Sequence, residues 1–206
     1  MSTTEQTDTT RQLRADARRN RRRILDAAAE VFAEQGAEAQ IDDVARRADL
    51  GVGTIYRHFP TKEALVAELV RQKFVAFVEH AREALAQDGE PFDVLAALLR
   101  RNAAFCSRDA AVQHALSGSG EALWTNAESE IQELLGITHE LVTRAQAAGT
   151  MRPDVSASDI PMLMCGVSAT MAHDFPGFDW HRHLELVIDM LRAGGHIGVD
   201  ADGREN

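Results

Sequence analysis

Apolar residues recur every three or four positions along most of the chain, which is the spacing that gives an α-helix one buried face. Gly36 follows the first stripe, where it can end a helix in a left-handed conformation, and Asp49-Leu50-Gly51 makes a tight break between the second and third. Three short helices, the last two joined by a turn, have the layout of a helix-turn-helix unit. The three stripes are Ile24, Ala27, Ala28, Val31 and Phe32; Ile41, Val44, Ala45 and Ala48; and Val52, Ile55, Tyr56 and Phe59.

Longer helical patterns occupy the rest of the chain. One helix is predicted from Thr61, whose hydroxyl can cap it, to near Gly89. Further helices are predicted at about 91–106, 109–117, 127–148, 157–173 and 180–194. The predicted fold class is therefore all-α, with about nine helices, arranged as a helix-turn-helix domain at 18–64 and a helical body at 65–206. Residues 1–17 are polar and rich in threonine, so we expect a disordered, basic arm.

Charge is distributed unevenly along the chain. The whole sequence carries a formal net charge of −10, which by itself disfavours binding to nucleic acid. Residues 11–23, however, hold seven arginines against the single acid Asp16, whereas residues 65–206 hold 11 basic and 21 acidic residues. This asymmetry indicates one end that meets a polyanion and a body that stays soluble. A solvated tail without a partner is the alternative explanation of the basic run.

Several classes of protein are disfavoured by what the sequence lacks. It has no Gly-rich phosphate loop, no GxSxG and no HExxH motif, so we expect no enzyme, no cofactor and no metal site. No uncharged run reaches the roughly 20 residues that cross a bilayer, and the polar start lacks the core of a signal peptide. Cys106 and Cys165 lie in apolar helical patterns without a CxxC partner, as buried, reduced thiols do. We therefore expect a cytoplasmic protein without membrane contact.

The segment Gly51–Leu65, GVGTIYRHFPTKEAL, sets hydrogen-bonding side chains between apolar ones on a short helix, and a second helix follows at once. With ILDAAAEVFAEQG and IDDVARRA before it, this segment resembles the DNA-binding domain of the tetracycline-repressor (TetR) family of regulators. The resemblance covers residues 20–65 and is closest at Gly53, Tyr56, Phe59, Lys62, Glu63 and Leu65. It implies a homodimer on double-stranded operator DNA, a small-molecule pocket in the body, and repression that the ligand relieves.

A helix that reads DNA needs one anchored face and one face of donors and acceptors for the major groove. Ile55 and Phe59 lie one turn apart and can anchor this helix on the first two helices. Arg57 is the candidate for a guanine contact, because its guanidinium matches O6 and N7. Tyr56, His58 and Lys62 match phosphate contacts of the family. The residues assigned to DNA are Arg22, Gln40, Val52, Gly53, Thr54, Tyr56, Arg57, His58 and Lys62.

Three positions depart from the family pattern. Gln40 stands where Thr or Ser usually caps the second helix, and Gln is a poor N-cap. Asp49 stands where Gly is usual in the turn, although Asp tolerates the left-handed conformation better than most residues. Gly51 stands where Ser is common, so the third helix lacks a side-chain cap.

The body carries the expected dimer seam and ligand pocket. The last two predicted helices can form a four-helix bundle with a second subunit, although their stripes can also pack inside one subunit. The seam is assigned to Met162, Gly166, Ala169, His173, Leu184, Val187, Ile188 and Leu191. The pocket for a hydrophobic inducer is assigned to Phe74, Phe77, Phe105, His114, Trp124, Thr138, His139, Val142 and Cys165, each of which can also be ordinary core.

The sequence thus predicts a ligand-responsive, DNA-binding transcriptional regulator, most simply a repressor that leaves a palindromic operator when a small molecule binds its body. The alternative is a helical adaptor that uses its helix-turn-helix face to bind another protein.

Overall fold

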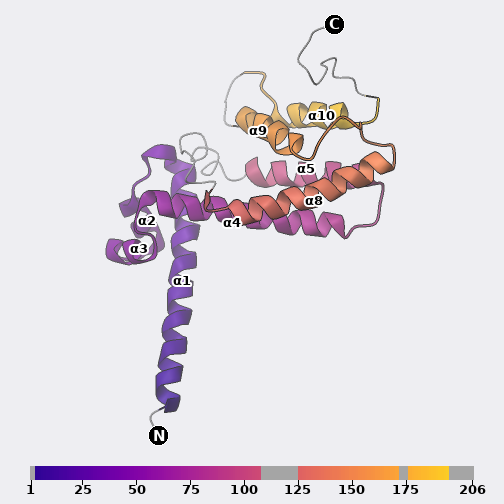
Figure 1. Ribbon diagram of the computed structural model, residues 1–206. Coiled ribbons are helices and arrows are strands. Elements are labelled where there is room, and N and C mark those ends of the chain that lie inside the picture. Colours follow the sequence, from indigo (N-terminus) through magenta and orange to yellow (C-terminus); the bar gives the residue numbers. More distant parts are fainter. Residues whose placement is uncertain (1–2, 108–124, 172–175, 195–206) are drawn as a thin grey trace. The chain divides into compact units, whose positions relative to one another are not determined.

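The computed structural model describes residues 3–107, 125–171 and 176–194. They form eight α-helices, α1 to α5 and α8 to α10, and one short 3-10 helix (Figure 1). The predicted all-α fold class is confirmed. Within the described ranges, no helix is both long and apolar enough to cross a bilayer. The predicted helix at 109–117 and the site residues His114, Trp124 and His173 lie outside the described residues.

The chain divides into two units. Unit 1 comprises residues 1–72 and 109–127, and unit 2 comprises 73–108 and 128–206. The boundary falls inside α4, so this one continuous helix belongs to both units. Unit 1 contains α1 (Thr3–Gln35), the 3-10 helix (Gly36–Glu38), α2 (Ile41–Ala48), α3 (Val52–His58) and the first part of α4 (Lys62–Leu85). Unit 2 contains the rest of α4, α5 (Pro91–Ser107), α8 (Glu128–Ala147), α9 (Asp159–Met171) and α10 (Trp180–Leu191).

Helix α1 begins at Thr3 and not near Arg18, so most of the segment that we expected to be disordered is helical. The reason is that no Gly or Pro occurs in this helix, while Glu, Gln, Ala, Leu and Arg are all good helix formers. Its C-terminal part buries the stripe from Ile24 to Phe32 that the sequence predicted. Gly36, with φ of 61°, ends the helix in the expected left-handed conformation.

The turn between α2 and α3 depends on Asp49, whose φ of 51° and ψ of 51° place it in the left-handed region, as predicted. Helix α1 packs against α2, and α2 packs against α3. The predicted stripe of α2 is buried, from Ile41 to Ala48. Two hydrogen-bonded ion pairs also fasten α2 to α1, because Arg47 donates to Glu30 at 2.8 Å and to Glu34 at 2.7 Å. The hydrogen bond from Arg47 lowers the pKa of Glu34.

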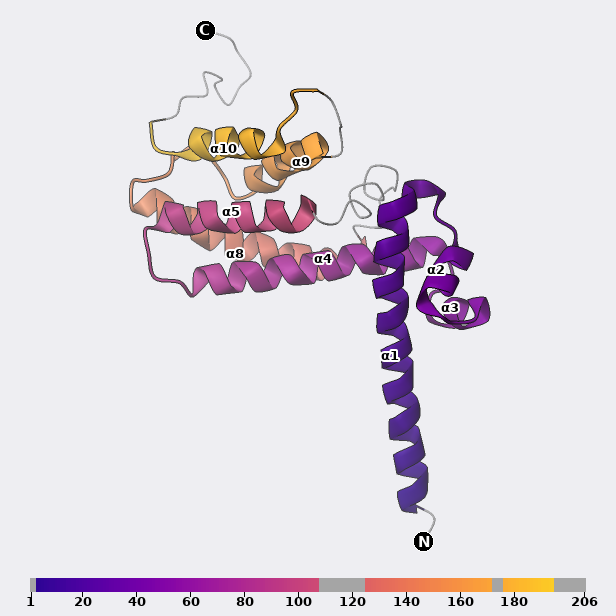
Figure 2. The ribbon, with the colours of Figure 1, turned by 180° about the vertical axis from the view of Figure 1, so that it is seen from behind.

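In unit 2, α9 packs against α10, and α5 lies between this pair and α8, as both views show (Figures 1 and 2). Apolar residues of all four helices form one core, which also takes in Ala81 and Ala84 from the end of α4. Ion pairs fasten α10 to α5: Arg100 with Glu185 at 2.7 Å, and Arg192 with Asp93 at 3.1 Å. The largest core residues include Phe92, Leu95, Leu141, Met151, Val167, Leu184, Ile188 and Leu191.

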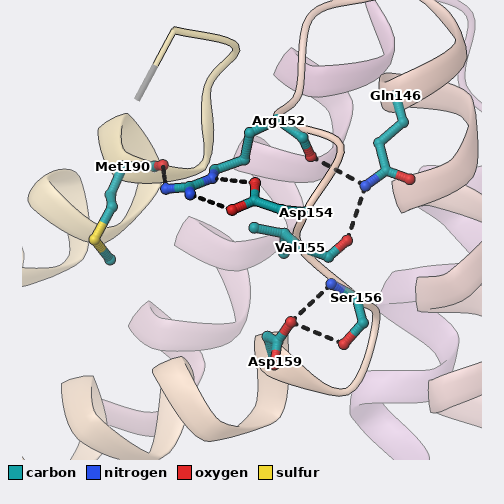
Figure 3. Close-up of polar contacts among 7 residues, drawn as sticks. All are labelled: Gln146, Arg152, Asp154, Val155, Ser156, Asp159 and Met190. Atoms are coloured by element: carbon teal, nitrogen blue, oxygen red, sulfur yellow. Dashed lines mark hydrogen bonds and ion pairs between the residues drawn. The ribbon is translucent and has the colours of Figure 1, made fainter. Parts of the chain in front are cut away.

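A set of hydrogen bonds fixes the loop between α8 and α9 against the end of α10 (Figure 3). The side chain of Arg152, only 4% exposed, pairs with Asp154 and donates to the carbonyl of Met190 at 3.5 Å. The amide of Gln146 donates to the carbonyls of Arg152 and Val155 at 3.0 and 2.8 Å. The orientation of α9 beside α10 is therefore held by the backbone of this loop as well as by side-chain packing.

The same loop leads into α9, and its hydrogen bonds fix the start of this helix. Ser156 donates both its N–H and its hydroxyl to the carboxylate of Asp159, at 2.7 and 2.8 Å (Figure 3). Helix α9 begins at Asp159, so Pro161 falls in its first turn, where a missing N–H costs no helical hydrogen bond. One expectation for α9 was wrong: the thiol residue Cys165 is exposed, not buried.

Candidate nucleic-acid interface

Helix α3 is short, and one side of it is buried. Ile55 is fully buried, and Phe59, which follows the last residue of the helix, is 2% exposed. The N–H of Phe59 donates to the carbonyl of Ile55 at 2.8 Å, which closes the last turn. Gly51 caps the helix through its backbone alone, as expected from its missing side chain. The helix is thus held in place by apolar contacts on one face, which leaves the other face for a partner.

The other face of α3 carries the polar side chains. Tyr56 is 48% exposed, which excludes the role of a core aromatic, and Arg57 is exposed as well. Thr54 and His58 are partly exposed. Within the part of the chain that is described, none of these four side chains forms a hydrogen bond or an ion pair. Their donors and acceptors are therefore available to an external group.

No packing constraint among the described residues explains the glycine at position 53. A Cβ atom there would meet none of their atoms within 4 Å, and the residue has an ordinary helical conformation. Val52 beside it is partly exposed. A residue without a side chain at the start of the exposed face lets another molecule approach the backbone closely.

The start of α4 lies next in the chain and carries a further cation. Thr61 caps this helix, accepting a hydrogen bond from the N–H of Ala64 at 3.1 Å, as the sequence predicted. Lys62 stands at the first helical position, with its Nζ 5.6 Å from the centre of the Phe32 ring. Gln40 is exposed, but its side-chain amide donates to the carbonyl of Glu38 at 2.7 Å. A phosphate contact from Gln40 would have to replace that bond.

The arginine run divides into two groups that the sequence did not distinguish. Arg23 donates to the carbonyl of Ala48 at 2.7 Å and so fastens α1 to the end of α2. Arg21 lies with its guanidinium 4.5 Å from the centre of the Phe59 ring. The helical repeat is the only sequence signal that separates Arg21 and Arg23 from the other arginines, because these two lie close to the buried stripe of α1. The remaining arginines of the run are all exposed: Arg11, Arg14, Arg18, Arg19 and Arg22, of which Arg22 is 3.9 Å from Asp26.

The structure brings together only part of the predicted ligand pocket. Phe77 lies edge-to-face with Phe74 and with Phe105, at ring separations of 5.8 and 6.0 Å. Thr138 is buried with its hydroxyl bonded to the carbonyl of Leu134, and Val142 is part of the core of unit 2. His139 and Cys165 are exposed. The assignment of the exposed His139 and Cys165 to an enclosed pocket is therefore corrected, whereas that of Thr138 and Val142 stays a prediction.

Sequence reasoning missed a polar pair beside these rings. His80 lies edge-to-face with Phe105 at 5.5 Å, and its Nδ1 is 2.8 Å from the side-chain oxygen of Asn102. The spacing of His80 from Phe77 along α4 was the available signal, since residues three apart share a helix face.

The residues predicted to form the dimer interface fall into two groups, one buried within the subunit and one exposed. Leu184, Val187, Ile188 and Leu191 are buried in the core of their own subunit, so their assignment to a seam between subunits is corrected. The physical reason is that α10 uses this stripe to cover α5 and α9. Met162, Gly166 and Ala169 are exposed, on one face of α9. Leu186 and Met190 are exposed on the opposite side of α10 from the buried stripe.

Comparison with known proteins gives matches over both parts of the chain. Residues 24–69 match the family model of bacterial regulatory proteins of the tetR family, and residues 90–193 match that of the C-terminal domain of SbtR-like transcriptional regulators. The transcriptional repressor KstR of Mycobacterium tuberculosis is 29% identical over 185 residues, which cover 87% of this chain and 84% of KstR.

Solved structures agree with this. A TetR transcription regulatory protein from Mycobacterium vanbaalenii is 37% identical, with a TM-score of 0.62, covering 87% of this chain and 99% of its own. The TetR-family repressor FadR of Thermus thermophilus, solved in complex with lauroyl-CoA, is 25% identical, with a TM-score of 0.59, covering 90% of this chain and 100% of its own. The chain therefore belongs to the tetR family of bacterial regulatory proteins, which is a family of DNA-binding transcriptional regulators and not of enzymes.

Proposed function

We propose that the protein binds a palindromic operator as a homodimer, with the α3 helix of each subunit in the major groove. The observation that carries this proposal is the exposed face of α3, whose side chains have no partners among the described residues while Ile55 and Phe59 are buried. Arg57 reads a guanine, and Thr54, Val52 and the bare backbone at Gly53 approach neighbouring bases. Tyr56, His58, Lys62, Arg22 and Gln40 contact phosphates, which set register without reading sequence.

Selection of duplexes from a random-sequence pool by the purified full-length protein tests this function. The duplex that is enriched, called the selected duplex below, should contain two related half-sites in inverted order, because a two-fold dimer presents the same helix twice. Enrichment of a single, non-repeated site would contradict the palindromic operator. The adaptor alternative predicts that no duplex is enriched at all.

The N-terminal part of α1 extends the DNA-binding surface in this proposal. It projects beyond α2 and α3 in both views (Figures 1 and 2). Arg11, Arg14, Arg18 and Arg22 are spaced three or four residues apart and are exposed, so they form one stripe on this helix. We assign the stripe to phosphates that flank the operator, because a row of guanidinium groups at helical spacing carries no base-specific pattern.

Replacing Arg11 and Arg14 together by Gln should weaken binding to the selected duplex and to a random duplex by the same factor. Each phosphate contact that is lost should reduce the slope of log affinity against log salt by about 0.9. Gln keeps the helix propensity close to that of Arg. The measurement is fluorescence anisotropy over a series of salt concentrations. Arg19→Gln is the matched control, because Arg19 pairs with Asp16 and lies off the stripe. An unchanged slope in the double variant would exclude the phosphate role.

Dimerisation in this proposal uses α9 and α10. Met162 is 65% exposed and Leu186 50% exposed, so both apolar side chains are open to contact with a second subunit. The small residues Gly166 and Ala169 share a face of α9 with Met162 and permit close helix packing. Two such helices from each subunit make a four-helix bundle. The loop around Arg152 fixes the orientation of α9 against α10 and so gives both helices a defined outer surface.

The ligand in this proposal is an apolar molecule with a polar end, of the acyl-CoA type. Phe74, Phe77 and Phe105 lie together but, among the described residues, outside the hydrophobic core of unit 2. The His80–Asn102 pair stands at the edge of these rings and supplies polar groups. Ligand sites combine a largely apolar lining with a few polar groups in this way. The lauroyl-CoA complex of the Thermus thermophilus relative indicates which ligand class to test first.

Replacing Phe77 by Ala should weaken the binding of lauroyl-CoA by about 10- to 100-fold, because burial of an aromatic side chain against a ligand contributes about 1.5–3 kcal/mol. Isothermal titration calorimetry with lauroyl-CoA measures this. Val75→Ala is the matched control, because Val75 lies on the same helix with an exposed side chain. Failure of the unmodified protein to bind lauroyl-CoA would reject the acyl-CoA class, and equal binding by Phe77→Ala would reject the aromatic cluster as the site.

A further inference from the structure

A buried acid stands in unit 1 at the start of α4, away from the exposed face of α3. Glu68 is 8% exposed. Arg71, one turn later on α4, donates to both of its carboxylate oxygens, at 3.0 and 3.1 Å. Arg21 of α1 reaches the same carboxylate at 3.1 Å. Glu68 is therefore the common partner of two arginines that come from different helices.

Arg21 connects this acid to the end of α3. Its guanidinium carbon is 4.5 Å from the centre of the Phe59 ring, a cation–π distance. Phe59 is the residue whose N–H closes the last turn of α3. One guanidinium thus touches the residue that ends α3 and the acid of α4, while its own backbone belongs to α1. The relative placement of these three helices is linked through a single side chain.

The chemistry of this group is unlike that of a surface ion pair. Burial raises the pKa of Glu68, but hydrogen bonds and charges from Arg71 and Arg21 together lower it by more, so the pKa lies below its usual value and the acid is ionised at neutral pH. Glu68 loses most of its hydration, while the side chains of Arg21 and Arg71 stay 40% and 34% exposed, so the desolvation of the acid offsets much of what the pairing contributes to stability. What the pairing does provide is a fixed geometry, since a carboxylate accepts from guanidinium groups only in defined directions.

We propose that Arg21 and Glu68 are positioning residues for DNA recognition, which set the direction in which α3 presents its outer face without touching DNA themselves. The inference rests on the proposed function of α3 in reading an operator. Loosening this contact leaves the side chains of α3 in place but lets the helix turn against α1 and α4. Base contacts depend on direction and suffer, whereas the general attraction of phosphates to nearby cations does not.

Glu68→Gln tests the proposal because long-range electrostatics and a loss of orientation change the affinity for DNA in opposite directions. Removing a negative charge from a DNA-binding unit strengthens binding to any duplex if only long-range electrostatics acts. A loss of orientation instead weakens binding to the selected duplex, by about tenfold, which is the size of losing one good base contact. Binding to a random duplex should stay equal or become slightly tighter, and the salt slope should not fall.

The experiment compares the full-length protein with Glu68→Gln, Arg21→Lys and Glu34→Gln by fluorescence anisotropy on the selected and the random duplex, with thermal unfolding recorded for each. Glu34→Gln is the matched control, since Glu34 also pairs with an arginine of unit 1, Arg47, but between α1 and α2. Arg21→Lys keeps a charge near Glu68 and loses the flat group over Phe59, so we expect an intermediate loss. It also covers the case in which the glutamine variant folds poorly.

Three results would overturn the proposal. The first is a Glu68→Gln variant that binds the selected duplex as tightly as the unmodified protein or more tightly. The second is an equal loss on both duplexes for Glu68→Gln and for Arg21→Lys, since that reports unfolding or lost phosphate contacts. The third is that the unmodified protein prefers no duplex. This result rejects the proposed function itself, and it is distinguished from the other two because it is obtained without any variant.

Discussion

A Met162→Glu variant should sediment as a monomer at concentrations where the unmodified protein is a dimer, and its affinity for the selected duplex should fall by about 10²- to 10⁴-fold. Met162 is exposed on the face of α9 that we assign to the subunit interface, so the substitution costs the single subunit nothing. Two-fold symmetry places the new carboxylate in the interface twice, without a partner for either charge. A monomer holds only one α3 helix, and the gain from binding two half-sites together is lost.

Val75→Glu is the control for this change. Val75 is also an exposed apolar residue of unit 2, but it lies on α4 and outside the assigned interface. Analytical ultracentrifugation should give a dimer for this variant and a monomer for Met162→Glu. The assignment of the interface to α9 fails if both variants remain dimers with unchanged operator affinity.

Arg57→Ala should weaken binding to the selected duplex by about 1–3 kcal/mol and relax the preference at one base pair of each half-site. Arg57 is exposed on α3 and, in the described part of the chain, its guanidinium has no internal partner. Its removal therefore affects DNA contacts and not the packing of Ile55 beneath. Affinities for the selected duplex and for its single-base variants at constant salt give both quantities.

Arg46→Ala is the matched control for Arg57→Ala. Arg46 is an exposed arginine of α2 that pairs with Asp43 at 3.0 Å, and we assign it no base contact. Its loss should reduce affinity slightly and equally on every duplex. A variant at Arg57 that behaves in the same uniform way would show that this side chain contacts phosphate only.

Periodicity was sufficient to predict α2, because its stripe is short and strict, whereas in α3 it marked Ile55 and Phe59 correctly but also included the exposed Tyr56. The buried residues of α2, from Ile41 to Ala48, are those expected from the 3.6-residue repeat. The left-handed turn at Asp49 and the cap at Thr61 also followed from local chemistry, since each depends on one residue and its immediate neighbours.

Contacts between distant segments could not be predicted in the same way. The stripe of α10 at Leu184–Leu191 indicates burial, but an apolar stripe does not tell whether the same subunit or a second one covers it. The weaker signal of Leu186 and Met190 on the other face would have pointed to the outer surface. Likewise, the arginine run gives net charge, whereas the separate roles of Arg21 and Arg23 depend on Phe59 and Ala48, far away in sequence.

The central claim is that the outer face of α3 reads a specific DNA sequence. The measurement that tests it most directly is the ratio of dissociation constants of the unmodified protein for a random duplex and for the selected duplex, at one physiological salt concentration. The account predicts a ratio of about 10³ or more, in the range typical of sequence-specific regulators. Equal dissociation constants for the two duplexes would contradict it.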